Sequence, residues 1–103
     1  MDRKFRPLTP QQCVDEASRL ARFLIEYERR PDGLNMALAI EKAERRWHLP
    51  PRTLQRLKYK PGELSDVRAS TLDALRAAYE ELYQRQRERM LAERRLNEIK
   101  LHN

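Results

Sequence analysis

Residues 45–62 read RRWHLPPRTLQRLKYKPG and carry six basic side chains but no Asp or Glu. The flanking residues 1–44 and 63–103 each carry eight basic and eight acidic residues, so the whole net charge of +6 arises within this one stretch. Balanced charge is typical of a solvated helical surface, whereas a local block of one sign is typical of a surface that binds an anion. With a pI near 9.9, the chain is expected to bind acidic partners, of which nucleic acid is the commonest.

A helical break and a short helix are predicted inside this stretch. The pair Pro50-Pro51 must end the preceding helix, because a residue before proline is pushed out of the α region. Proline also suits the first position of a helix, so the next helix is predicted over residues 51–59, and Pro61-Gly62 ends it. This order of helix, turn and helix predicts a helix-turn-helix unit.

The predicted helix 51–59 has two different faces. At 100° per residue, Leu54 and Leu57 fall on one side, where they face a core. Four long polar or aromatic side chains share a sector of about 100° on the other side: Arg52, Gln55, Arg56 and Tyr59. Such an arrangement suits a helix that lies in a groove of its partner.

Two longer helices are predicted before the basic stretch. The first begins after Thr9, which forms a capping-box pattern with Gln12, and it ends at residues 31–33, Pro-Asp-Gly. The second covers about residues 34–47, and its apolar spacing places Trp47 on the buried side.

One long helix is predicted after the basic stretch. Residues 60–69 form a loop, and residues 70–73, STLD, have the pattern of a helix cap. From residue 71 onward, an apolar stripe runs along the helix through Leu72, Leu75, Tyr79 and Leu82. The stripe decays after Tyr83 without a sustained coiled-coil pattern, so the tail is either a projecting charged helix or a helix that binds a partner.

A chain of 103 residues with two Gly and many good helix formers is predicted to be one all-α domain. We expect a compact bundle of about four to five helices with a helix-turn-helix unit and a long C-terminal helix. The predicted parts are a basic arm over residues 1–8, a helix-turn-helix domain over 9–83 with its unit at 40–59, and a charged C-terminal helical extension over 84–103.

Few features point to a membrane, a metal or catalysis. The single cysteine, Cys13, has no partner for an internal disulfide, which indicates a reducing compartment. The first residues, MDRKFRPL, lack the apolar region of a signal peptide, and no run of about 18 apolar residues exists, so a cytoplasmic protein is expected. His48 and His102 are isolated, and no catalytic set or glycine-rich phosphate loop stands out. We therefore expect no enzyme activity, no cofactor, no metal and no small-molecule substrate.

Residues 40–59 resemble the helix-turn-helix unit of the lambda-repressor-like (Cro/repressor, XRE-type) family. When Ile40 is set as the first residue of the unit, the buried positions of the motif fall on five apolar residues: Ala43, Trp47, Leu49, Leu54 and Leu57. The helices before and after these residues also match the family's five-helix plan. The resemblance implies an all-α DNA-binding domain.

Two positions depart from the family pattern. Glu44 stands where the family usually has Ala, which packs against the next helix, and this implies a looser turn, a wider helix angle or a shift of one residue. His48 stands at the usual turn Gly, and histidine tolerates the left-handed conformation better than most residues. The double proline is also unusual for the family.

The resemblance implies which residues contact DNA. The groove-facing positions of the family fall on Pro51, Arg52, Gln55 and Arg56, and the last three also lie on the polar face of the predicted helix. Arg pairs bidentately with guanine and Gln with adenine. The DNA backbone would then be contacted by Arg45, Arg46, Thr53, Lys58, Tyr59 and Lys60.

Two hypotheses follow. The first is a sequence-specific regulator of transcription, such as a repressor, that binds double-stranded DNA as a homodimer, because one short recognition helix rarely gives enough affinity. The second is an all-α adaptor that uses the basic block to bind RNA or an acidic protein surface and the long last helix to bind a partner. The operator, repression versus activation, and the dimer interface stay open.

Overall fold

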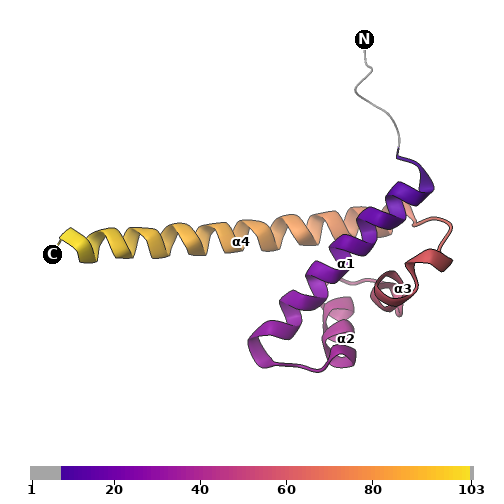
Figure 1. Cartoon of the computed structure of the whole chain (residues 1–103), viewed down its shortest axis with the longest axis horizontal. Helices are drawn as coiled ribbons and strands as arrows, with labels where there is room; N and C mark the ends of the chain where they lie inside the picture. Colours follow the sequence, from indigo (N-terminus) through magenta and orange to yellow (C-terminus); the bar gives the residue numbers. More distant parts are fainter. Residues whose placement is uncertain (1–7, 103) are drawn as a thin grey trace, which may run out of the picture.

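Four α-helices and one short 3-10 helix make up the part of the chain that the structure describes, residues 8–102 (Figure 1). In this computed structural model the elements are α1 (Pro10–Asp32), α2 (Met36–Arg46), α3 (Thr53–Tyr59), the 3-10 helix η1 (Pro61–Glu63) and α4 (Ala69–His102). No strand occurs within the described residues, and the predicted all-α class is confirmed. The basic side chains of the predicted arm, Arg3, Lys4 and Arg6, lie outside the described residues.

Both ends of α1 follow the signals in the sequence. Thr9 Oγ1 accepts a hydrogen bond from the Gln12 N–H at 3.1 Å, and Gln12 Oε1 accepts one from the Thr9 N–H at 2.9 Å. The predicted capping box is therefore confirmed. The helix ends at Gly33, whose φ of 61° lies in the left-handed region that glycine adopts without steric cost.

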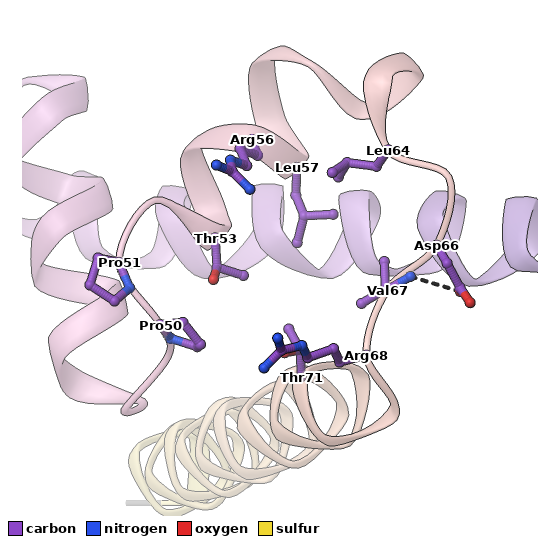
Figure 2. Close-up of a pocket in the computed structure, with 10 residues that line it drawn as sticks. All are labelled: Pro50, Pro51, Thr53, Arg56, Leu57, Leu64, Asp66, Val67, Arg68 and Thr71. Carbon is purple, nitrogen blue, oxygen red and sulfur yellow. Dashed lines mark hydrogen bonds between the residues drawn. The ribbon is translucent and has the colours of Figure 1, made fainter.

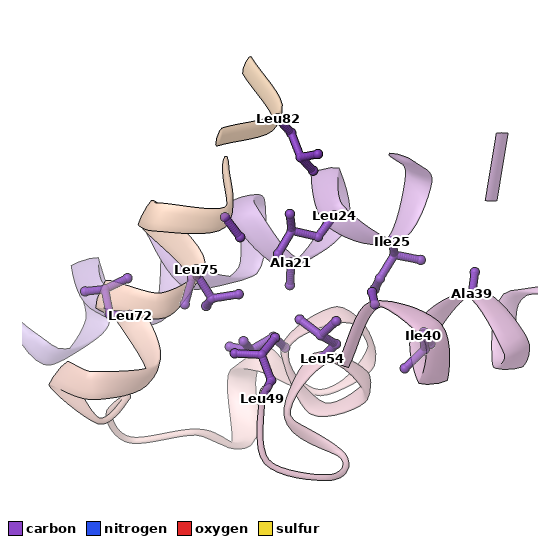
Figure 3. Packing of buried hydrophobic residues seen from close by; sticks show 14 residues of the cluster. Ala21, Leu24, Ile25, Ala39, Ile40, Leu49, Leu54, Leu72, Leu75 and Leu82 are labelled. Carbon is purple, nitrogen blue, oxygen red and sulfur yellow. The ribbon is translucent and has the colours of Figure 1, made fainter. Parts of the chain in front are cut away.

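Helix α1 is the centre of the core, because it packs against α2, α3 and α4. Buried residues recur along one side of it: Val14, Ala17, Ala21, Leu24 and Ile25. Leu54 from α3 and Leu75 from α4 belong to the same buried cluster as Ala21 and Leu24 of α1 (Figure 3). One continuous core thus joins helices that are far apart in the sequence.

Helix α4 is docked over its first part and projects over the rest. Leu72, Leu75 and Leu82 are buried, and Tyr79 lies edge-on against Phe23 of α1, with 4.8 Å between the ring centroids. From residue 83 to residue 101 every position is exposed, although the helix continues to His102 (Figure 1). The apolar stripe therefore ends where the sequence predicts, and a charged helical rod of about 30 Å extends beyond it.

Three predicted boundaries are corrected by the structure. Helix α2 begins at Met36 because Asn35 is its cap, with the Asn35 side-chain oxygen accepting the Leu38 N–H at 2.9 Å. Helix α4 begins at Ala69 rather than at residue 71, and η1 forms within the predicted loop. The third correction, at the start of α3, belongs to the candidate site.

An ion pair between α1 and α4 is expected to make stability depend on pH. Glu16 accepts two hydrogen bonds from the Arg76 guanidinium, at 2.5 and 2.8 Å. These bonds hold the pKa of the Glu16 carboxyl below its ordinary value of 4.5, against a smaller opposing effect of burial. A carboxyl whose pKa is lowered by folding stabilises the protein above its unfolded pKa, and this contribution is lost as pH falls through the folded pKa. An NMR titration should give Glu16 a pKa below 4.5 that rises toward 4.5 in Arg76→Ala, and equal values in the two proteins would contradict the assignment.

Candidate nucleic-acid interface

The helix before the interface ends in a left-handed turn at His48. The His48 φ is 53°, its N–H donates to the Arg45 carbonyl at 3.4 Å, and the Leu49 N–H donates to the Glu44 carbonyl at 2.9 Å. These two bonds are those of a Schellman motif, which closes a helix with a left-handed residue. His48 therefore has the left-handed conformation that histidine tolerates better than most residues.

A tight turn at the proline pair moves the start of α3. The Thr53 N–H donates to the Pro50 carbonyl at 3.2 Å, and Arg52 has φ 68° and ψ 1°, so residues 50–53 form a type II turn. The predicted start at residue 51 is wrong, because Pro51 presets the second position of this turn instead of the first turn of a helix. Arg52 is held left-handed before the helix, at a cost of about 1–3 kcal/mol for such a conformation in a residue with a side chain.

Glu44 caps the start of α3 from the neighbouring helix α2. Its Oε2 accepts the Leu54 N–H at 2.9 Å, while the cap residue Arg52 makes no side-chain cap bond. A carboxylate is favourable at this end of a helix because the exposed N–H groups carry partial positive charge. The sequence predicts that Glu44 is accompanied by a looser turn, a wider helix angle or a shift of one residue. The structure has the looser turn, because six residues separate α2 from α3, against three to four in ordinary helix-turn-helix turns.

The inner face of α3 is anchored to α1. Leu54 and Leu57 are buried, as predicted, and the Ser18 hydroxyl of α1 donates to the Leu57 carbonyl at 2.8 Å within the core. This bond satisfies a backbone carbonyl near the end of the helix that has no partner inside it. The anchor fixes which side of α3 faces solvent.

The outer face of α3 borders a shallow groove of about 740 Å³, here called the α3 groove. Its lining residues are Arg52, Gln55, Arg56, Tyr59, Lys60, Glu63 and Leu64. The structure thus brings together five of the predicted DNA contacts. Among the described residues, no carboxylate forms an ion pair with Arg52, Arg56 or Lys60, so their charges face solvent.

The other predicted contacts lie elsewhere. Pro51 and Thr53 line neighbouring depressions rather than the α3 groove, and Lys58 is half-buried with its Nζ 5.5 Å from the Tyr59 ring centroid. Arg45 and Arg46 both lie on α2 and hold ion pairs, which makes them a separate group from the α3 residues.

The ion pairs of the two α2 arginines differ in burial. Arg45 contacts Glu41 at 2.6 Å, and both side chains are exposed. Arg46 contacts Glu28 at 2.6 Å, and the Glu28 side chain is only 3% exposed. The Arg46 guanidinium also lies 5.8 Å from the centroid of the Trp47 ring. Arg46 is therefore part of the packing of α1 against α2.

Sequence reasoning missed three residues around the interface. Glu63 brings an acid to the α3 groove one residue after the acid-free stretch ends. Arg68 and Thr71 line a second pocket together with Arg56 of α3 (Figure 2). Arg68 is exposed just before α4, and the only sequence signal was a basic residue next to a predicted helix start.

Within residues 8–102, no helix is both long and apolar enough to cross a membrane, and no three His, Cys, Asp or Glu side chains gather as metal ligands would. Comparisons of the chain with protein-family models, with curated proteins and with solved structures gave no match.

Proposed function

We propose that this chain is a sequence-specific DNA-binding regulator of transcription, a repressor acting in the cytoplasm, which inserts α3 into the major groove. The observation that carries the proposal is the outer face of α3. Gln55 and Arg56 of α3 line the α3 groove together with Arg52, which directly precedes the helix, and neither arginine forms an ion pair with a described carboxylate. Arginine suits guanine and glutamine suits adenine, each good pair giving about 1–3 kcal/mol of discrimination.

The dimensions of α3 favour a dimer. A helix of seven residues is about 10 Å long, and its diameter of about 10–12 Å matches a major groove about 12 Å wide. Such a short helix reads only a few base pairs, so useful specificity requires two copies. We expect a homodimer on two inverted half-sites about one helical turn apart.

The resemblance of residues 40–59 to the lambda-repressor-like unit supports this proposal. His48 takes the left-handed turn position, and Leu49, Leu54 and Leu57 are buried as the family pattern implies. The Glu44 cap and the six-residue connection between α2 and α3 depart from the usual pattern of that unit.

Arg56→Ala is expected to lower affinity for a selected duplex by about tenfold to a hundredfold and to relax its sequence preference, because it removes a base contact. Lys60→Ala should instead weaken all duplexes about equally and reduce the salt slope by about one. The measurement is selection from a random duplex pool at about 50 and about 200 mM salt, followed by titrations with the enriched motif.

Arg85→Ala is the matched control, because Arg85 is an exposed arginine of α4 that pairs with Glu81 at 2.6 Å, outside the α3 groove. It should leave the sequence preference unchanged. Binding that loses all preference at the higher salt, or an Arg56→Ala protein with unchanged preference, would reject α3 as the reading helix.

A second candidate function rests on the projecting part of α4. Large apolar side chains are exposed there, among them Met90, Leu96, Ile99 and Leu101. The candidate is an all-α adaptor that binds RNA or an acidic protein through the basic block and a partner through α4. Removing residues 84–103 separates the two, since an adaptor would lose its partner and a repressor would lose dimerisation but keep residual DNA contact.

A further inference from the structure

We infer that the pocket between α3 and the start of α4 binds a phosphate ester, and that its occupant is a backbone phosphodiester of the nucleic acid. This pocket, here called the α3–α4 pocket, measures about 300 Å³. Its polar lining consists of Thr53, Arg56, Asp66, Arg68 and Thr71. The inference rests on the proposed function for the source of the phosphate, but not for the phosphate chemistry.

Positive charge enters the pocket from two separate segments. Arg56 belongs to α3 and Arg68 to the loop before α4, and Figure 2 draws both around the same space. Neither forms an ion pair with a described residue, so two guanidinium groups share the pocket without an internal counterion. Two like charges in one concave site favour an anion that can accept bonds from both. Arg56 has five N–H donors, so it can pair with a base through two of them and contact a phosphate through another.

Neutral donors complete the polar lining. The hydroxyls of Thr53 and Thr71 come from the two helices that form the pocket walls. The first backbone bond of α4 runs from the Leu72 N–H to the Arg68 carbonyl at 3.0 Å, so Thr71 stands in the first turn, where helix N–H groups favour negative charge. Hydroxyls and arginines in this combination are the usual contacts of phosphate oxygens.

One acid lines the same pocket and opposes an anion. Asp66 Oδ1 accepts the Val67 N–H at 2.7 Å, and Figure 2 shows the Asp66 side chain at the outer edge, turned away from Arg68 and Thr71. The pocket lining therefore has two positively charged side chains, Arg56 and Arg68, and one negatively charged side chain, Asp66, at its edge. Asp66 offers a useful variant, since Asp66→Asn removes the charge but keeps an acceptor for the Val67 N–H.

The remaining walls favour an ester over free phosphate. Apolar side chains make up the rest of the lining: Pro50, Pro51, Leu57, Leu64 and Val67. A pocket of about 300 Å³ exceeds the size of one phosphate group, so there is room for the carbon atoms attached to it. Arg56 and Leu64 line both this pocket and the α3 groove, so the two adjoin each other. A DNA strand that leaves the α3 groove would therefore bring its next phosphates to this pocket.

The test combines small probes with duplex DNA. Dimethyl phosphate and inorganic phosphate are titrated into the full chain at constant ionic strength, with sodium chloride as the reference, and the Thr71 amide and Arg68 Nε–H signals are followed by NMR. We expect saturable shifts with dimethyl phosphate that are absent with chloride, lost in Arg68→Ala and tighter in Asp66→Asn. In duplex titrations, Arg68→Ala should lower affinity for every sequence by about tenfold and reduce the salt slope by about one, because one phosphate contact is lost.

Each result decides between named alternatives. No saturable shift with either phosphate probe, or equal shifts with chloride, overturns the pocket. Saturable phosphate shifts combined with unchanged duplex affinity in Arg68→Ala overturn the nucleic-acid source and identify a free phosphorylated compound as the ligand. Gln55→Ala separates the two proposals, since Gln55 lines the α3 groove but not the α3–α4 pocket. A further outcome is that Gln55→Ala and Arg56→Ala leave the sequence preference unchanged while Arg68→Ala lowers duplex affinity. That result would support the phosphate site in the α3–α4 pocket and reject α3 as the helix that reads the bases.

Discussion

Leu75→Ala is expected to lower the free energy of unfolding by about 3–4 kcal/mol. Leu75 is 0% exposed and belongs to the cluster that joins α4 to Ala21 and Leu24 of α1 (Figure 3). A buried Leu→Ala change loses the transfer free energy of the side chain and leaves a cavity, and together these cost about 2–5 kcal/mol. Urea unfolding followed by circular dichroism at 222 nm measures the effect.

Leu96→Ala is the matched control on the same helix. Leu96 is 57% exposed on the projecting part of α4, so its replacement should change stability by less than about 0.5 kcal/mol. The comparison shows which part of α4 belongs to the cooperative unit. Equal losses for the two variants would mean that the far half of α4 is packed against something in solution.

Arg46→Ala is expected to lower the free energy of unfolding by about 3 kcal/mol, although Arg46 is a surface arginine by sequence. Its guanidinium contacts Glu28 at 2.6 Å, and the Glu28 side chain is 3% exposed. Removal would leave a buried carboxylate with Lys42 at 3.7 Å as its remaining ion-pair partner. Breaking one side of a buried pair costs about 3–5 kcal/mol, and the 40% exposure of the Arg46 side chain places this case at the lower end.

Arg45→Ala is the neighbouring control, because its pair with Glu41 is exposed on both sides and contributes less than about 0.5 kcal/mol. The double variant Glu28→Gln/Arg46→Ala should recover part of the loss, since no charge is then left buried. A double variant as unstable as Arg46→Ala alone, or equal effects of Arg45→Ala and Arg46→Ala, would contradict the buried pair. Any change of DNA binding in Arg46→Ala must accordingly be measured below the temperature at which that variant unfolds.

Local signals explain why most of the fold was predictable. The capping box at Thr9 and Gln12 needs only residues three apart, and the stripe from Leu72 to Leu82 needs only helical periodicity. Both features are set within a few turns of one helix. Both are confirmed in the structure.

The start of α3 was not predictable by the same means. Proline is favoured both at the first helical position and at the second position of a β-turn, so residues 50–53 fit two local structures. The β-turn forms, and Glu44, ten residues before Leu54 in the chain, accepts the Leu54 N–H. A cap that comes from another helix leaves no pattern in the local sequence.

In the candidate site too, the features set by local sequence were predictable and those set by contacts between distant residues were not. The shared face of Gln55, Arg56 and Tyr59 follows from helical geometry, and the α3 groove contains all three. The adjacent Arg45 and Arg46 look alike in sequence, yet of the two only Arg46 forms an ion pair with the buried Glu28 of α1 and so belongs to the packing of α1 against α2. Arg68 is a similar case, because the pocket that it lines together with Arg56 depends on how residues 64–68 connect η1 to α4.

The exposed part of α4 fixes both the distance and the direction of its tip relative to the core. Each residue adds about 1.5 Å and about 100° of rotation, so Leu101 stands about 27 Å beyond Tyr83 on nearly the same side of the rod. Removing one residue between them would turn the tip by about 100° with almost no change in reach, whereas removing seven would restore its direction and shorten it by about 10 Å. Whatever meets the tip of this helix is therefore selected by angle more sharply than by distance.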